Sequence, residues 1–498
     1  MGGSMDSVSL DFYGCMIRPI ILLCFHGVYS KMEDTNLDLS YLRICLQQWL
    51  DDHSRKLNWL AITANLTPSV LWRFMKKNRP IEASSILRLY NVIRNDMAPN
   101  QSERFLEAAC LRGLVAELAR GTKQGNVTGT DTLGGGAANP ITDGVILMRT
   151  SMTRPWRDAV PLLLQAERAF GPGSTMAAYC ACDAAANLIN LGDLAQAETH
   201  LLRAAETYER IMDPMTKAHY SVVRANLEYD RGNLLLARHW HMNCITIAEA
   251  VMQPSLADES HLYMSMIALG LGKSASGGEQ ETCFNEAERW MQQTMTRHQK
   301  AGVEDWVAGL DYLRRGQLRF AQGKVVETDA DIAEAHRLLR GNVAEHHVDI
   351  HVAETALEDG NTAQAVKLAT SAIEDWSANS YAGGMGRSMR IMASAAHQEG
   401  HSEQALEMAI AAACINPYGV YDDRAALIQA TADAYSVVRR RLSRSAYSKL
   451  LKEMRARADE KTGVFHYLNS VTTERSNDIQ QVFARYSTVS RNRPYPPE

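Results

Sequence analysis

The stretch LGDLAQA at residues 191–197 returns in altered form four more times along this chain of 498 residues. Each copy has a glycine near its start, and an alanine or threonine follows that glycine five positions later. A segment that returns at a nearly fixed period is typical of a protein built from stacked structural repeats. The other copies are DRGNLLLA (230–237), AQGKVVET (321–328), EDGNTAQA (358–365) and QEGHSEQA (398–405).

Three columns of small residues keep register with these glycines. Two antiparallel helices approach closely only where the side chains at their crossing are small, and glycine suits the turn between them. The columns therefore predict one helical hairpin in each copy. They are Ala185, Ala225, Gly316, Ala353 and Ala393 (seven before the glycine), Ala197, Ala237, Thr328, Ala365 and Ala405 (five after), and Ala204, Cys244, Ala335, Ala372 and Ala412 (twelve after).

The spacing of these small positions resembles that of the tetratricopeptide repeat (TPR), although the period here, 37–40 residues, is longer than that family's usual one. The 91 residues between Gly232 and Gly323 fit two repeats, so we expect a degenerate repeat around Gly277–Gly278. Residues 150–485 show helical periodicity and no strand-like alternation. The sequence therefore predicts an all-α fold, with six repeats that form a TPR-like α-solenoid.

Residues 57–80, LNWLAITANLTPSVLWRFMKKNRP, predict a helix-turn-helix ahead of the repeats. Ala61 is small where the second helix would cross the first. Asn65 occupies the turn, and asparagine tolerates a left-handed backbone better than most residues. Thr67 followed by Pro68 is typical of a helix start. The residues of the second helix expected to face inward are Leu71, Phe74 and Met75.

The segment around this motif is basic. Residues 40–96 hold nine Lys and Arg against four acidic residues, whereas the whole chain has a formal charge of −5, so this end favours a polyanionic partner. With flanking helices expected over 41–52 and 81–94, the segment resembles the DNA-binding domain of Cro/C1-type phage repressors. That resemblance implies binding to double-stranded DNA, with base edges read by the outer face of the second helix and phosphates contacted by its far end. The candidate DNA-binding residues are Thr67, Ser69, Trp72, Arg73, Lys76, Lys77 and Arg79.

Composition predicts how the chain is divided into domains. Residues 121–144 are rich in Gly, Thr and Asn and contain almost no large apolar groups, which is typical of a flexible linker. The expected parts are an N-terminal extension, expected to be disordered (1–36), a helix-turn-helix DNA-binding domain (37–118), a Gly-rich linker (119–148), TPR-like repeats (149–422), C-terminal capping or dimerisation helices (423–485) and a disordered tail (486–498).

A Cro/C1-like domain joined to TPR-like repeats resembles the peptide-pheromone regulators of bacteria and their phages, which include the arbitrium receptors. The resemblance implies a homodimer that binds a short peptide or protein signal along the first helix of each repeat. Asn and Gln side chains suit a peptide backbone, and Arg387 and Arg390 suit a carboxylate. The repeat register nominates Tyr179, Asn190, His219, Asn226, Asp230, Gln317, Phe320, His347, Glu354, Glu358, Arg387, Arg390, Ser394 and Gln398.

Two other functions are compatible with parts of the same pattern. A TPR scaffold that recruits a protein partner, with an N-terminal bundle that does not bind DNA, would show the same repeats. An enzyme has no supporting motif, and we expect no catalytic residue and no cofactor. GLGKS (270–274) has Ile267 where a phosphate loop needs glycine. HHVDIH (346–351) lacks the glutamate of a zinc protease, so we expect no metal site.

Cysteine usage and hydropathy bear on the compartment. Nine cysteines in 498 residues are sparse and odd in number, which favours free thiols in the cytoplasm. The apolar run 16–25 is too short to span a bilayer, so we expect no membrane association.

The run GGMGRS (383–388) is expected to be a turn between repeats.

Overall fold

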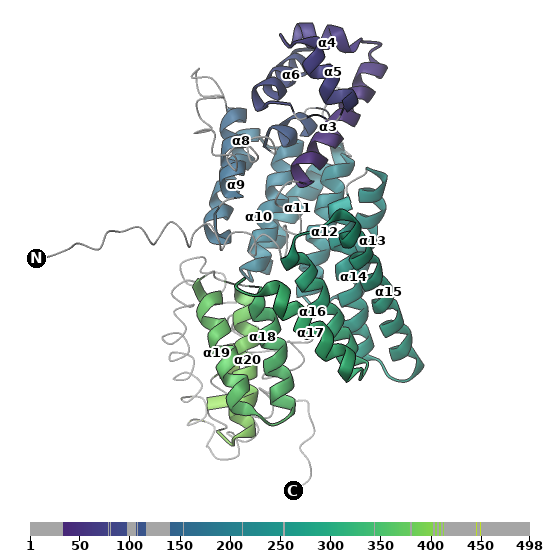
Figure 1. Ribbon diagram of the computed structural model, residues 1–498. Helices are drawn as coiled ribbons and strands as arrows, with labels where there is room; N and C mark the ends of the chain where they lie inside the picture. The colour runs from purple at the N-terminus through teal and green to yellow at the C-terminus, as the bar shows by residue number, and fades with distance from the viewer. Residues whose placement is uncertain are drawn as a thin grey trace, which may run out of the picture. The chain divides into compact units, whose positions relative to one another are not determined.

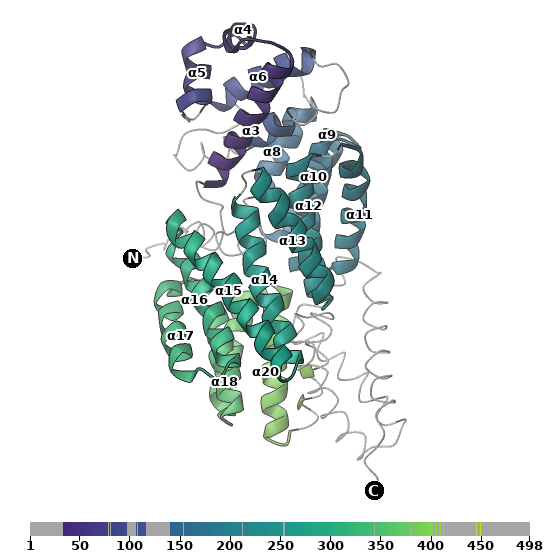
Figure 2. The same cartoon turned by 90° about the vertical axis from the view of Figure 1, so that its right-hand side faces the viewer.

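The computed structural model describes residues 33–96 except 78 and 80, residue 106, residues 108–115, residues 140–401 except 153, 212, 252, 253, 343, 379 and 380, and residues 404, 405, 408, 409, 412, 445 and 449. Every regular element in these residues is an α-helix (Figure 1, Figure 2), which confirms the all-α fold class. The helices are α3 (Glu33–Asp52), α4 (Leu57–Thr63), α5 (Pro68–Lys77), α6 (Ala83–Asp96), α8 (Pro140–Ser151), α9 (Trp156–Phe170), α10 (Thr175–Asn190), α11 (Leu194–Ile211), α12 (Pro214–Asp230), α13 (Leu234–Ala250), α14 (Pro254–Ser274), α15 (Gly278–Ala301), α16 (Asp305–Ala321), α17 (Val325–Leu339), α18 (Glu345–Glu358), α19 (Thr362–Ala378) and α20 (Ala382–Gln398).

Helical hairpins follow one another from α10 onward, as the repeat register predicts. Five hairpins pair consecutive helices from α10 to α19, and helical residues after Gly400 follow α20 as the second helix of a sixth. Each turn needs the left-handed backbone that glycine adopts without steric cost. The turn glycines are Gly192 (φ 73°), Gly232 (79°), Gly277 (62°), Gly323 (74°), Gly360 (77°) and Gly400 (81°), which confirms the six repeats, including the degenerate one.

The small columns lie at the helix crossings. All fifteen column residues are buried. At Gly316 on α16, an added Cβ would lie 3.0 Å from Ile332 Cδ1 and 3.3 Å from Asp331 Cβ on α17. A larger side chain would therefore push the two helices apart, which is the reason the sequence keeps this column small.

In the degenerate repeat, different residues allow the two helices to cross closely. On α14, a Cβ added to Gly272 would lie 2.6 Å from Phe284 Cδ1 on α15. Phe284 is buried and packs in one cluster with Ala287 and Ala268. An aromatic ring thus fills the crossing from one helix while glycine makes room on the other, so the small-residue column is not visible in this copy.

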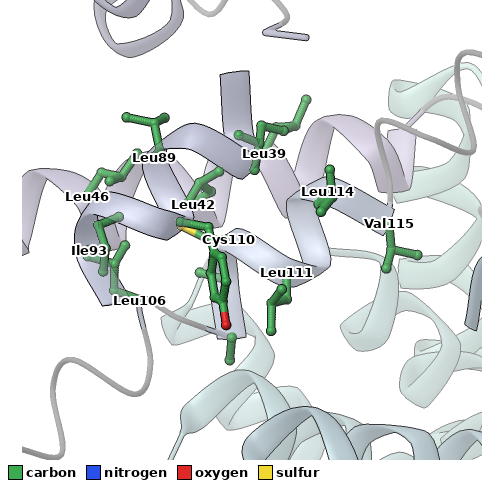
Figure 3. Close-up of a cluster of buried hydrophobic side chains, with 14 of the residues drawn as sticks. Leu39, Leu42, Leu46, Leu89, Ile93, Leu106, Cys110, Leu111, Leu114 and Val115 are labelled. Atoms are coloured by element: carbon green, nitrogen blue, oxygen red, sulfur yellow. The ribbon is translucent and has the colours of Figure 1, made fainter. Parts of the chain in front are cut away.

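The chain divides into two compact units. Unit 1 comprises the residues up to Leu188 together with Ala195–Asn226 and His239–His261, and unit 2 comprises the remainder. One hydrophobic core in unit 1 includes Leu42 of α3, Leu71 of α5, Val145 of α8 and Cys180 of α10. Figure 3 shows Leu111 and Leu114 of helical residues 108–115 in one cluster with Leu39, Leu42 and Leu46 of α3. The N-terminal helices and the first repeats therefore share one core.

Two boundaries and one expected turn differ from the sequence prediction. Helix α3 begins at Glu33, inside the expected extension, and α8 begins at Pro140, inside the expected linker, because Val145 and Met148 are buried in the unit 1 core. The run GGMGRS lies within α20 and is not a turn. The rest of the expected extension (1–32), linker residues 119–139, the C-terminal helices apart from 445 and 449, and the tail (486–498) lie outside the described residues.

Candidate DNA-binding surface and ligand-binding residues

The helix-turn-helix consists of α4 and α5, joined at Asn65. Asn65 has a φ of 51°, in the left-handed region, as its turn position predicts. The turn is closed by two backbone hydrogen bonds, from Asn65 N to Ile62 O (3.0 Å) and from Leu66 N to Ala61 O (2.8 Å). The guanidinium of Arg88 on α6 donates to the Asn65 carbonyl oxygen at 3.0 Å. The turn is therefore held both by its own backbone and by the following helix.

The inner face of the motif fixes the rotation of α5. Ala61 on α4, together with Leu71 and Phe74 on α5, is buried with no more than a trace of exposed surface. Met75 is half-buried at the margin of the same core. Because a helix turns about 100° per residue, burying positions 71 and 74 directs positions 69, 72, 73 and 76 away from the core.

The outer face of α5 is open to solvent. Trp72 is 46% exposed, so its ring does not belong to the core. Arg73 Nε donates to the Ser69 carbonyl oxygen at 3.2 Å, and the Lys77 ammonium lies 5.6 Å from the centre of the Trp72 ring. All seven candidate DNA-binding residues are exposed: Thr67, Ser69, Trp72, Arg73, Lys76, Lys77 and Arg79. The structure thus brings them together on one cationic surface, which we call the α5 face.

Two further exposed basic residues lie beside this motif, outside the candidate DNA-binding set. Arg55 and Lys56 precede α4, and the Arg55 guanidinium lies 4.2 Å from the centre of the Trp59 ring. Their position before the first helix is a signal that sequence reasoning could have used, because cations at helix-turn-helix margins can contact phosphate.

Of the residues nominated for ligand binding, those in unit 1 make specific contacts with neighbouring helices. The ring of Tyr179 on α10 stacks on that of His219 on α12, with centroids 4.2 Å apart and planes inclined by 12°. His219 Nε2 lies 2.8 Å from Asp183 Oδ1. Asn226 Nδ2 donates to Glu259 Oε1 at 3.1 Å. These side chains join the first helices of consecutive repeats.

In unit 2, the nominated arginines already hold a carboxylate. Arg387 on α20 donates through Nε and Nη2 to Glu354 on α18 at 3.0 and 2.6 Å, and Arg390 donates to the same group. Burial alone would raise the pKa of Glu354, but the two guanidinium groups outweigh it and lower the pKa to about 2. Gln398 donates to the Leu357 carbonyl oxygen at 3.1 Å. The first helices of the last repeats are therefore joined by charge-assisted hydrogen bonds.

Exposure separates the nominated residues into groups. Five are buried between helices and do not present their side chains to solvent, which differs from the expectation that they face a ligand. Repeat register identifies the helix face that meets the next repeat, but it does not tell how far the next repeat covers that face. The buried ones are Asn190, His219, Asn226, His347 and Arg390; Tyr179, Asp230, Gln317, Phe320, Glu354, Arg387 and Ser394 are half-buried; Glu358 and Gln398 are exposed.

Burial also perturbs the protonation of two nominated residues. It raises the pKa of Asp230 to about 7. It lowers the pKa of His347 to about 3, helped by the positive charges of Arg314 and Arg387. The two shifts lower the stability of the fold at opposite ends of the pH range. Rising pH destabilises the fold through Asp230, because burial disfavours its ionised form. Falling pH destabilises it through His347, because burial disfavours its protonated form.

We expect His347→Gln to flatten the acid side of the pH–stability profile. The unfolded chain takes up a proton on His347 near pH 6.5, whereas the folded chain does so only near pH 3. The contribution of neutral His347 to the free energy of unfolding is therefore fully present above pH 6.5. It is lost as pH falls below that value, by at most about 1.4 kcal/mol per pH unit. Urea unfolding at pH 7 and pH 5 measures the difference. His401→Gln, at an exposed histidine, is the matched control, and equal slopes for both variants would contradict this prediction.

Within the described residues there is no group of three or more His, Cys, Asp or Glu side chains placed to hold a metal ion. Among the described helices, none combines the length and apolar character that crossing a bilayer requires.

No family model and no curated protein sequence matches this chain. Solved structures do match. One is a Signal Transduction ATPase with Numerous Domains (STAND) protein with a tetratricopeptide repeat sensor from Pyrococcus horikoshii, at 15% identity and a TM-score of 0.38, over 78% of this chain and 57% of that one. Another is a Rap protein complexed with Competence and Sporulation Factor, at 10% identity and a TM-score of 0.42, over 87% of this chain and 99% of that one. The present chain thus spans little more than half the length of the STAND protein.

Proposed function

We propose that this chain is a sequence-specific DNA-binding transcription regulator, and that its helical repeats bind a peptide or protein signal that modulates DNA binding. The α5 face is the observation that carries the proposal. It exposes Arg73 and Lys76 while Leu71 and Phe74 anchor the same helix in the core. A recognition helix needs this division, because it must be held rigidly while its outer residues enter the major groove.

Sequence choice and affinity would come from different residues of the α5 face. Arg73 and Lys76 lie at its centre, where a side chain reaches base edges, and arginine pairs well with guanine. Lys77 and Arg79 lie at its C-terminal end, where they would contact phosphate. We further propose that the protein is a cytoplasmic homodimer, because one domain of this size covers too few base pairs to be selective.

The repeats supply the second half of the proposal. Their half-buried polar and aromatic residues, such as Tyr179, Gln317 and Arg387, can exchange their contacts with neighbouring side chains for contacts with a peptide. A scaffold without DNA binding is favoured by a different observation. Leu235, Val325 and Val326 are 70%, 62% and 79% exposed in unit 2, and exposed apolar side chains suit a protein partner.

Salt dependence of duplex binding tests the DNA-binding proposal and separates it from the scaffold. We expect the full-length chain to bind a labelled random-sequence duplex in fluorescence anisotropy, with affinity falling steeply from about 50 to about 200 mM salt. Lys77→Ala should reduce the slope of log affinity against log salt by about one per DNA-binding domain. Lys367→Ala, an exposed lysine on α19, should leave it unchanged. Absence of duplex binding at low salt would overturn the proposal and leave the scaffold.

A further inference from the structure

A buried carboxylate in unit 1 joins the N-terminal helices to the repeats. Asp213 lies in the turn between α11 and α12 and has no exposed surface. Its Oδ2 accepts a hydrogen bond from the Thr216 backbone N–H at 3.0 Å, so it caps α12 just before Pro214. Its Oδ1 accepts the Tyr41 hydroxyl of α3 at 3.0 Å, and its Oδ2 accepts Arg112 Nη1 at 3.1 Å. The Asp213 side chain, which belongs to the repeats, is thus hydrogen-bonded to Tyr41 and Arg112, which belong to two segments of the N-terminal bundle.

Arg112 is a buried cation with an aromatic ring near it on each of two helices. Its guanidinium carbon lies 5.2 Å from the ring centre of Tyr41 and 5.7 Å from that of Tyr179 on α10. The helix that carries Arg112 is fixed closely to α3, because a Cβ added to Gly113 would lie 3.1 Å from Leu42 Cδ2. The backbone that carries Arg112 is therefore packed directly against α3.

The contacts continue beyond Arg112 into the residues nominated for ligand binding. Tyr179 stacks on His219, which in turn contacts Asp183 at 2.8 Å. The result is a continuous path of side-chain contacts from α12 and α10 to α3. We call it the Arg112 relay, and it consists of Asp183, His219, Tyr179, Arg112, Asp213 and Tyr41.

We propose that the Arg112 relay transmits a change at Tyr179 to helix α3, and that this is the route by which a ligand on the repeats alters the DNA-binding helices. Members of a buried polar network polarise one another, so loss of one contact changes the others. The Tyr179 ring shields part of the Arg112 guanidinium from water, and the Asp213 carboxylate neutralises its positive charge. A ligand that pulls the Tyr179 ring from Arg112 therefore weakens the contact that holds Tyr41. The ligand part rests on the proposed function, whereas the coupling from Tyr179 to α3 is a property of the chain alone.

Hydrogen exchange on the full-length chain, without DNA or ligand, tests the coupling. We expect Tyr179→Leu to speed exchange of the α3 amides between Leu39 and Leu50 by about fivefold, because it removes one of the two aromatic rings that flank Arg112. Tyr179→Phe keeps the ring and should leave α3 protected. Tyr208→Leu removes a half-buried tyrosine of α11 that lies outside the relay, and it should leave α3 unchanged.

A double-mutant comparison identifies the route. In an Arg112→Met background, Tyr179→Leu should produce no additional change in α3 exchange, because the path is already interrupted. If circular dichroism shows that Arg112→Met does not fold, Arg112→Lys, which keeps the charge but loses the planar fork, takes its place. Unchanged α3 exchange in Tyr179→Leu, or an equal change with and without the Arg112 substitution, overturns the relay. Absence of duplex binding by the unsubstituted full-length chain would overturn only the proposed function, so the two failures are distinguishable.

Discussion

Full-length protein that carries both Arg73→Ala and Lys76→Ala is expected to lose about a hundredfold or more in affinity for its preferred duplex. Each base-edge contact of an arginine or lysine contributes about 1–3 kcal/mol of discrimination, and two such contacts account for this loss. Both side chains are exposed, so helix content and thermal stability should remain those of the unsubstituted protein. Fluorescence anisotropy measures the affinity, and circular dichroism measures the fold.

The matched control changes the same net charge elsewhere. Lys300→Ala with Lys367→Ala removes two exposed cations from α15 and α19. This control should retain most of the affinity and all of the sequence preference, because distant surface charges act only through screened electrostatics. If the α5 variant binds as tightly and as selectively as the control, Arg73 and Lys76 are not the base-reading residues.

The second large effect concerns two adjacent glycines near the start of α20. A Cβ added to Gly384 would lie 2.4 Å from two ring atoms of Trp376 and 2.6 Å from Tyr381 Cδ1, whereas one added to Gly383 would lie 3.3 Å from the Tyr381 ring. Trp376 is only 2% exposed, so its ring is held inside the core. We expect Gly384→Ala to lower the free energy of unfolding by about 3 kcal/mol through overpacking. Gly383→Ala should change the free energy of unfolding by less than about 1 kcal/mol. The new methyl group would be slightly crowded by Tyr381, and the better helix propensity of alanine offsets that cost.

Urea unfolding of the two glycine variants, followed by far-UV circular dichroism, gives the comparison. The same substitution at neighbouring positions has the same effect on the unfolded chain, so the difference reports packing in the folded state. Equal effects at positions 383 and 384 would contradict the close approach of α20 to the Trp376 ring.

Features that depend on local sequence were predictable. The repeat glycines, the small columns and the left-handed turn at Asn65 each express a steric requirement on one or two residues, so their spacing was enough to place them. The rotation of α5 followed from the spacing of Leu71 and Phe74. Exposure of all seven candidate DNA-binding residues is consistent with that rotation.

Features that depend on distant residues were not predictable. Asp213 lies 172 residues from Tyr41 and 101 from Arg112, and no periodic pattern links them. Gly383 and Gly384 normally favour a turn, yet they lie in a helix, where Trp376 and Tyr381 occupy the space that larger side chains would need. The burial of predicted ligand residues such as Asn226 likewise depends on how closely the next repeat covers them.

Selection of duplexes from a randomised pool by the full-length protein, followed by sequencing, tests the central claim most directly. We predict that one short motif is enriched, in two copies related by the symmetry of a dimer, and that the enrichment is lost when Arg73 and Lys76 are both replaced by alanine. Enrichment of no motif, or of the same motif with both side chains removed, would contradict the assignment of the α5 face as a DNA-reading surface.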